Sequence, residues 1–284
     1  MRVGLVLAGG MAKGAYQVGA LKAISEYFDP EDLECMSCAS IGVLNGYAYA
    51  TGKLDAAEQM WRQCCKAGSR FYINSILKGT YVQQSILNVY HKEDALPCDL
   101  YAALLNINKR AINYTNLRHV DMKRMPDYLT ASVAMPVYNR WVNLDGDNYY
   151  DGAMVDNIPV MPLLEKQLDY IICVYFDESS YIFEKTDFDD RIIKVMFKSN
   201  RLIRDSIVFD KNSIEDMISK GYDKTKKLLD IVFSKGTDNL EYIYDTIRLM
   251  NEESGDKKLR ITGDFLVTNM NKIVQKLVNK KVKI

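Results

Sequence analysis

The sequence of 284 residues has no run of about 18 apolar residues, the length that an α-helix needs to cross a bilayer. It also has no excess charge, because 37 basic side chains balance 37 acidic ones. A chain without net charge has no general attraction for nucleic acid, so we expect no such partner. The apolar start of the chain is short and runs at once into glycines and Lys13, unlike a signal peptide. We therefore expect a globular, cytoplasmic protein.

The sequence also has few histidines, and its cysteines are not regularly spaced. The two histidines, His91 and His119, have no obvious acidic neighbour in the sequence, so a Ser-His-Asp hydrolase would be hard to assemble. Six irregularly spaced cysteines do not suggest a disulfide framework at this chain length. Cys35 and Cys38 form a CxxC pair, but no second pair follows, and residues three apart on a strand face opposite sides. We expect reduced thiols, no metal and no cofactor.

Hydrophobic residues make up 48% of the chain, enough for a sizeable core. Strand-like and helix-like segments alternate over the first 176 residues, which predicts an α/β fold whose mainly parallel sheet has helices on both faces. Strands are expected at 3–7, 110–115 and 170–176, and the first and last of them are buried. Residues 71–108 are mixed in pattern, and we interpret them as helices and loops beside the sheet. The later chain predicts a helical C-terminal extension, with helices at 202–209, 214–232 and 239–250.

One stretch, residues 35–46, is an apolar run that meets Ser40, turns at Gly42 and continues as a helix. A strand-turn-helix arrangement holds the residue at its tip in a strained conformation and exposes its side chain, as a nucleophile requires. The GxSxG pattern is incomplete, because Cys38 stands where the first glycine would be. A serine before a helix is also a common N-cap, so both interpretations stay open.

A glycine-rich loop, Gly9-Gly10-Met11-Ala12-Lys13-Gly14, lies between the first strand and the first helix. Its backbone N–H groups beside a helix N-terminus could hold a phosphate or the oxyanion of an acyl-transfer intermediate. Neither GxxxxGK[ST] nor GxGxxG occurs here. A simple tight turn is the third interpretation.

A second polar stretch, residues 143–159, is rich in aspartate and turn formers. It does not fit a calcium loop, because Tyr149 and Tyr150 occupy the fifth and sixth positions counted from Asp145. We instead place Asp151 at a strand exit and Gly152 in the turn, so that the carboxylate is a candidate general base. An Asx turn is the structural alternative.

The last segment, residues 271–284, carries five lysines and no acid around an apolar stripe. Such a segment could lie on an anionic bilayer as a peripheral contact. A solvated helix face has the same pattern.

Together, the Gly9–Gly14 loop, the Ser40 turn and Asp151-Gly152-Ala153 with Asn157 and Pro159 resemble the patatin-like phospholipase family in order and spacing. The resemblance covers roughly residues 1–180 and implies a catalytic core with a three-layer α/β/α sandwich. Residues 181–284 would be a mostly helical part packed on the same domain. The implied substrate is a lipid acyl ester, from phospholipid or lysophospholipid, and no metal is required.

By this resemblance, Ser40 is the nucleophile, Asp151 the base, and the N–H groups around Gly9, Gly10 and Met11 the oxyanion hole. The remaining residues of the two motifs support the site: Cys38, Ile41, Gly42, Lys13, Gly14 and Gly152. Three residues of the site depart from the family pattern and crowd it. Cys38 and Met11 replace glycines, and Ile41 is bulkier than the small residue usual after the serine.

Two other functions compete with a Ser-Asp hydrolase. Leu7-Ala8-Gly9-Gly10 followed by a lysine also resembles the start of sugar nucleotidyltransferases, with Asp145 and Asp147 as magnesium ligands. That interpretation gives Ser40 no role. The other alternative is a catalytically disabled relative that binds lipid in the same cleft.

Overall fold

The computed structural model of the chain describes residues 1–63, 80–136, 139–176, 190–198 and 211–254. The helix predicted at 202–209 and the basic segment 271–284 lie outside the described residues. None of the helices within these ranges is long and apolar enough to span a bilayer.

Eight strands form one mixed sheet, in the order β5-β6-β3-β2-β1-β7-β8, with β4 paired to β3. The five strands from β3 to β8 in this order are parallel, and β4, β5 and β6 are antiparallel additions. The strands are β1 (Val3–Leu7), β2 (Leu33–Ala39), β3 (Asp99–Asn106), β4 (Ala111–Asn116), β5 (Val142–Leu144), β6 (Asp147–Asp151), β7 (Tyr170–Phe176) and β8 (Ile192–Phe197).

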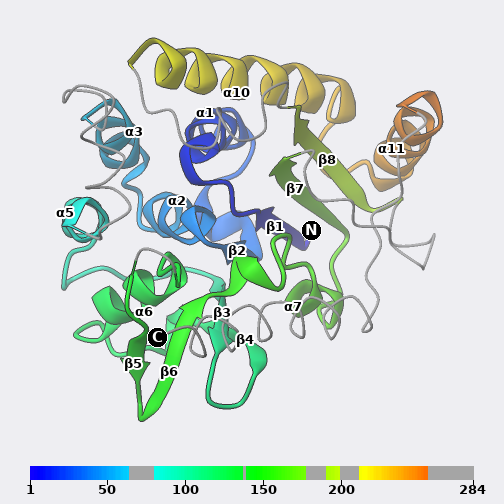
Figure 1. The fold of residues 1–284 in the computed structure, drawn as a ribbon. Coiled ribbons are helices and arrows are strands. Elements are labelled where there is room, and N and C mark those ends of the chain that lie inside the picture. The colour runs from blue at the N-terminus through cyan, green and yellow to red at the C-terminus, as the bar shows by residue number, and fades with distance from the viewer. Residues whose placement is uncertain (64–79, 137–138, 177–189, 199–210, 255–284) are drawn as a thin grey trace.

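Helices cover both faces of this sheet, with α1 and α10 above it and α7 below it in Figure 1. Successive side chains of β1 point to opposite faces of the sheet and so enter two separate cores. Leu5 belongs to the core under α1, α2 and α10, and Val6 belongs to the core under α7. The predicted three-layer α/β/α sandwich is therefore confirmed. The α-helices are α1 (Gly14–Ile24), α2 (Ile41–Ala50), α3 (Leu54–Gln63), α5 (Thr80–Val89), α6 (Met125–Ser132), α7 (Met161–Leu164), α10 (Lys211–Val232) and α11 (Leu240–Ser254).

The C-terminal part of the chain joins the same sheet and core. Strand β8 pairs with β7, and α10 lies against α1. Two glycines allow the helices to approach closely: a Cβ on Gly19 would lie 1.9 Å from the Ile218 carbonyl oxygen, and one on Gly221 would lie 2.2 Å from that of Tyr16.

The sequence interpretation was wrong at two strands. Strand β3 lies within residues 71–108, interpreted as helices and loops, and β8 lies where the pattern was taken as mostly helical. Both are short, mainly apolar segments whose residues are mostly buried, and periodicity does not distinguish such strands from buried helix.

Candidate active site

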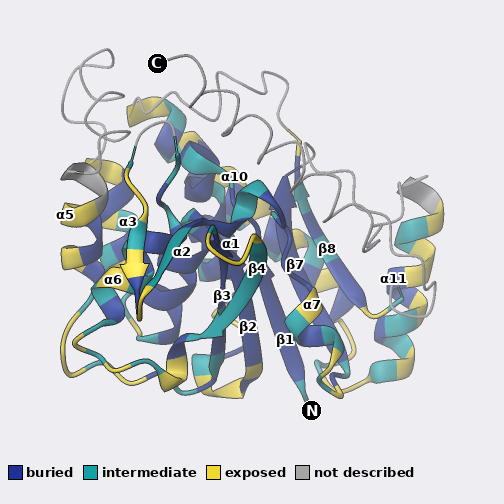
Figure 2. Ribbon diagram, turned by 60° about the horizontal axis from the view of Figure 1, so that its bottom comes forward, coloured by how far each residue is buried: buried dark blue, intermediate teal, exposed yellow. Residues whose placement is uncertain are grey.

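Ser40 occupies the turn between β2 and α2, near the carboxyl ends of the parallel strands (Figure 2). Its backbone has φ 54° and ψ −130°, a conformation that is costly for a residue with a side chain. The side chain makes no capping hydrogen bond to α2, although Ser40 stands at the N-cap position. The Ser40 hydroxyl instead acts on Asp151, whose pKa it lowers, so the simple N-cap interpretation does not describe this serine.

The turn is possible because the helix passes very close to β1. A Cβ on Gly42 would lie 2.5 Å from the Leu7 carbonyl oxygen and 3.0 Å from that of Ala8. Only a residue without a side chain fits between helix and strand at this point.

We predict that Gly42→Ala destabilises the fold by more than about 2 kcal/mol, because the contact is with backbone and neither partner can rotate away. Thermal or urea unfolding measures this loss. Gly52→Ala is an informative comparison, since a Cβ there meets nothing within 4 Å and only the positive φ of 68° opposes it. Equal stability of the Gly42 variant and the wild type would contradict the close approach.

The structure accommodates two departures from the family pattern through glycines elsewhere. The Cys38 Sγ lies 2.8 Å from where a Cβ on Gly46 would be, so the thiol fills space that this helix glycine leaves. The Ile41 side chain similarly fills the space beside Gly14, with Cγ1 2.9 Å from a Cβ placed there. These larger residues therefore pack around the turn without displacing it.

The thiols beside the turn are not reactive groups. Cys38 is completely buried, and burial raises the pKa of its thiol, which keeps it protonated at neutral pH. Cys35 lies in the other core, on the opposite face of β2, as the spacing of the CxxC pair predicts. The pair therefore forms neither a redox couple nor half of a metal site.

Asp151 ends β6 and is 2% exposed. One carboxylate oxygen accepts the Ala153 N–H at 2.9 Å, and the Ser40 hydroxyl is the other group that stabilises the charged carboxylate. Burial raises the pKa of Asp151 to about 7, against the lowering effect of these two groups. Asp151 therefore forms the Asx turn, and its burial makes the carboxylate a stronger base than one in water.

The glycine-rich loop lies beside this pair. A Cβ on Gly9 would lie 2.9 Å from the Ser40 Cβ, so the loop passes directly against the serine. Of the expected oxyanion donors around Gly9, Gly10 and Met11, the Gly9 N–H donates to the Asn157 carbonyl oxygen at 3.2 Å in this structure. Within the residues that the structure describes, no hydrogen-bond acceptor faces the N–H of Gly10 or Met11. Met11 has a φ of 50°, where the family pattern has glycine.

The other motif residues hold the loop and the aspartate in place. A Cβ on Gly10 would lie 2.4 Å from the Phe176 ring, and the Lys13 Nζ lies over the same ring, 5.1 Å from its centroid. Lys13 is almost completely buried. A Cβ on Gly152 would lie 2.4 Å from the Ala103 carbonyl oxygen, so the turn after Asp151 packs tightly on β3.

Three residues near the site were not assigned roles from the sequence. Gln17 and Asn157 contact the glycine loop, and Asp156 is a second buried carboxylate that accepts the Tyr114 hydroxyl at 2.5 Å. Burial raises the pKa of Asp156 to about 6. Asn157 belongs to the quoted motif, whereas a single polar residue on a helix, such as Gln17, gives no sequence signal of burial.

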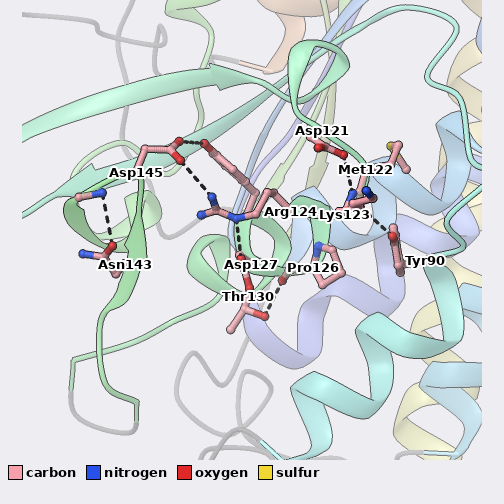
Figure 3. A network of polar contacts seen from close by, with 12 residues as sticks. Tyr90, Asp121, Met122, Lys123, Arg124, Pro126, Asp127, Thr130, Asn143 and Asp145 are labelled. Atoms are coloured by element: carbon pink, nitrogen blue, oxygen red, sulfur yellow. Dashed lines mark hydrogen bonds and ion pairs between the residues drawn. The ribbon is translucent and has the colours of Figure 1, made fainter.

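The remaining candidate residues lie elsewhere. Asp145 accepts hydrogen bonds from Arg124 at 3.1 Å and Tyr128 at 2.7 Å in the network of Figure 3. Asp147 forms an ion pair with Lys109 at 2.7 Å. These carboxylates are each paired with a cation, and the described part of the chain contains no cluster of three or more His, Cys, Asp or Glu that could hold a metal ion. Both histidines are exposed.

Comparisons with known proteins agree with this arrangement. The profile of the family described as patatin-like phospholipase matches residues 5–164. Lysophospholipase NTE1 from two strains of Cryptococcus neoformans var. neoformans serotype D is 27% identical over 186 residues, which cover 61% of this chain and 11% of the relative. The chain thus matches only about a tenth of the length of these curated relatives.

Two solved structures are also similar. VipD from Legionella pneumophila has a TM-score of 0.48 and 14% identity, covering 99% of this chain and 80% of VipD. The type III effector ExoU has a TM-score of 0.44 and 12% identity, covering 89% of this chain and 60% of ExoU. The profile match spans more than half of the chain and includes the loop, Ser40 and Asp151. The chain belongs to the patatin-like phospholipase family.

Proposed function

We propose that this chain is a serine acyl hydrolase that cleaves the acyl esters of phospholipids or lysophospholipids through Ser40 and Asp151. The observation that supports the proposal is a serine in a strained turn whose hydroxyl lowers the pKa of a buried carboxylate, Asp151. A neutral serine is a weak nucleophile, and a carboxylate within reach can accept its proton during attack. Family membership and the lysophospholipase relative support a lipid ester as the substrate.

The proposed reaction has two halves. The Ser40 oxygen attacks the ester carbonyl carbon, and its proton passes to Asp151. The tetrahedral intermediate collapses, and the leaving alkoxide takes that proton and departs as an alcohol. Water then loses a proton to Asp151 and attacks the acyl-serine, and the departing Ser40 oxygen recovers the proton as the fatty acid leaves.

The N–H groups of Gly10 and Met11 are the proposed oxyanion donors. Both are left without a protein acceptor in the described structure, and they belong to the loop that lies against Ser40. Backbone donors of this kind stabilise the negative charge that develops on the carbonyl oxygen, and losing one typically costs about 3 kcal/mol of transition-state stabilisation.

The experiment that tests the proposal is fatty-acid release from phospholipid vesicles and from lysophospholipid micelles, each with EDTA present. We expect release from at least one of these substrates without added metal. Magnesium-dependent nucleotide binding without release would contradict the proposal and favour the nucleotidyltransferase alternative. Lipid binding without release would favour the disabled relative, although the packing around Cys38 and Ile41 does not support that alternative.

The proposed base gives the reaction a defined pH dependence. Because the pKa of Asp151 is about 7, we expect kcat/KM to be constant above that pH and to fall about tenfold for each pH unit below it, as the carboxylate becomes protonated. A soluble short-chain ester measures this profile without changes in vesicle charge. Asp156→Asn is the matched control, since it removes the other carboxyl group whose pKa is raised. It should leave the midpoint of the pH profile unchanged. A midpoint near 4 would contradict the assignment of Asp151.

The cellular setting is a separate proposal. The four cysteines that the structure describes are free and buried, which suits a reducing compartment such as the cytoplasm. A peripheral membrane contact through the basic segment 271–284 is proposed on its composition alone.

A further inference from the structure

The Asn157 side chain and main chain together hold one peptide group of the loop beside Ser40. The Gly9 N–H donates to the Asn157 carbonyl oxygen at 3.2 Å, and Asn157 Nδ2 donates to the Gly9 carbonyl oxygen, also at 3.2 Å. In a planar trans peptide, the carbonyl and the following N–H point in opposite directions. Holding the carbonyl of Gly9 therefore fixes the direction of the Gly10 N–H, one of the two proposed oxyanion donors.

The preceding peptide group is held by Gln17, which is completely buried on α1. Gln17 Nε2 donates to the Ala8 carbonyl oxygen at 2.5 Å. The N–H of the same peptide is that of Gly9, which bonds to Asn157. The Ala8–Gly9 peptide is thus fixed at both ends by residues far apart in the sequence.

Gln17 is itself oriented by Asn45, which lies on α2, the helix that begins after Ser40. Asn45 Nδ2 donates to Gln17 Oε1 at 2.9 Å and to the Gly14 carbonyl oxygen at 2.9 Å. Trp61 Nε1 donates to Asn45 Oδ1 at 3.1 Å. This buried series of hydrogen bonds connects α2, the helix that follows Ser40, to the loop that contains the proposed oxyanion donors.

We propose that Asn157 and Gln17 are positioning residues that aim the Gly10 N–H, and through the loop that of Met11, at the oxyanion formed on Ser40. This inference rests on the proposed acyl hydrolase function and adds to it the residues that preorganise the oxyanion hole. Asn157 acts directly through the Gly9 carbonyl, and Gln17 acts through the Ala8–Gly9 peptide. Preorganised donors are effective because they need no reorientation during the reaction.

Buried amides must be hydrogen-bonded in any protein, so the network could serve stability alone. The two roles predict different kinetics. Substituting a residue needed only for stability lowers the amount of folded enzyme and reduces the rates for all substrates equally. Substituting a residue that aims oxyanion donors lowers kcat most for the substrate whose carbonyl oxygen is most strongly hydrogen-bonded in the transition state.

The test compares a short-chain oxoester with its thionoester, in which the carbonyl oxygen is sulfur, a weaker hydrogen-bond acceptor. Asn157→Leu and Gln17→Met remove the donors and keep similar side-chain volumes. We expect each variant to lower kcat for the oxoester by about 10- to 100-fold with little change in KM. The loss on the thionoester should be smaller, so that the oxoester-to-thionoester ratio of kcat falls by about tenfold.

Tyr49→Phe is the matched control, because it removes another buried hydrogen bond from α2, to the Phe28 carbonyl oxygen at 2.6 Å, without a contact to the loop. It should lower thermal stability and leave the ester ratio unchanged. Trp61→Phe removes the outer bond of the network and provides a milder variant if Gln17→Met does not fold. It should shift the ratio in the same direction, by less.

An equal loss on both esters, or no loss, in folded Asn157 and Gln17 variants would overturn the positioning role while leaving the proposed hydrolase intact. Failure of the proposed function has another signature, namely no Ser40-dependent hydrolysis of either ester by the wild type. That outcome would overturn both proposals together.

Discussion

Replacing Ser40 by alanine is expected to lower acyl-ester turnover by about 10⁴-fold or more, because the proposed acyl-enzyme forms on its hydroxyl. The fold should survive, since the Ser40 side chain does not cap α2 and alanine removes only its oxygen. The measurement is the rate of fatty-acid release from the preferred lipid, normalised to folded protein.

Ser37→Ala is the matched control for this loss. Ser37 lies on β2, just before Ser40, is completely buried, and its hydroxyl bonds to none of the residues that the structure describes. Its removal should leave turnover unchanged and stability equal or higher, because an unsatisfied buried hydroxyl disfavours the folded state. Retention of most activity by the Ser40 variant would show that another group is the nucleophile.

Replacing Asp151 by asparagine is expected to lower kcat by a similar factor while making the protein more stable at neutral pH. Asparagine can still accept the Ala153 N–H and the Ser40 hydroxyl, but it takes no proton from Ser40. Single substitutions of residues that act as one catalytic unit typically cost about 10⁴-fold or more.

The stability change follows from the direction of the pKa shift. The pKa of Asp151 in the folded chain, about 7, lies above its value in an unfolded chain. The native state therefore binds the proton more tightly, and this favourable contribution is lost as the pH rises from about 4 through 7. At pH 8 the wild type carries the cost of a buried charge, on the order of 4 kcal/mol at most for a shift of this size.

Denaturant unfolding of the wild type and Asp151→Asn at pH 4 and pH 8 measures this difference. We expect the variant to be the more stable protein at pH 8 and the two proteins to differ little at pH 4. A variant that is less stable at pH 8 would mean that the carboxylate is not buried as the structure has it. Together with the kinetic loss, the expected gain would show that burial of Asp151 serves catalysis at the expense of stability.

The candidate site could be predicted from the sequence where each part is local. Each part of the site occupies a few consecutive residues: the Ser40 turn, the glycine loop and Asp151-Gly152. The residues that favour such turns can be recognised in a sequence. What could not be predicted is which of their hydrogen-bonding groups are already used. The bond from the Gly9 N–H to Asn157 joins residues just over half of the chain length apart, so only the fold reveals that this donor is occupied.

The fold shows the same division between local and long-range information. The strand and helix alternation around β1, α1, β2 and α2 was clear from apolar runs and turns. Strand β3 was missed because its run of apolar residues lacks alternation, being covered on both faces. Gln17 was missed because a glutamine on a helix is usually solvated, and its buried partners come from other helices.

The most direct test of the central claim is to treat the protein with a fluorophosphonate, which phosphonylates activated serines, and to locate the adduct by peptide mass spectrometry. We predict an adduct on Ser40 in the wild type and a much slower reaction of Asp151→Asn at pH 8, where the wild-type carboxylate is ionised. An adduct on a different residue, or equally fast labelling of Ser40 in both proteins, would contradict a serine activated by Asp151.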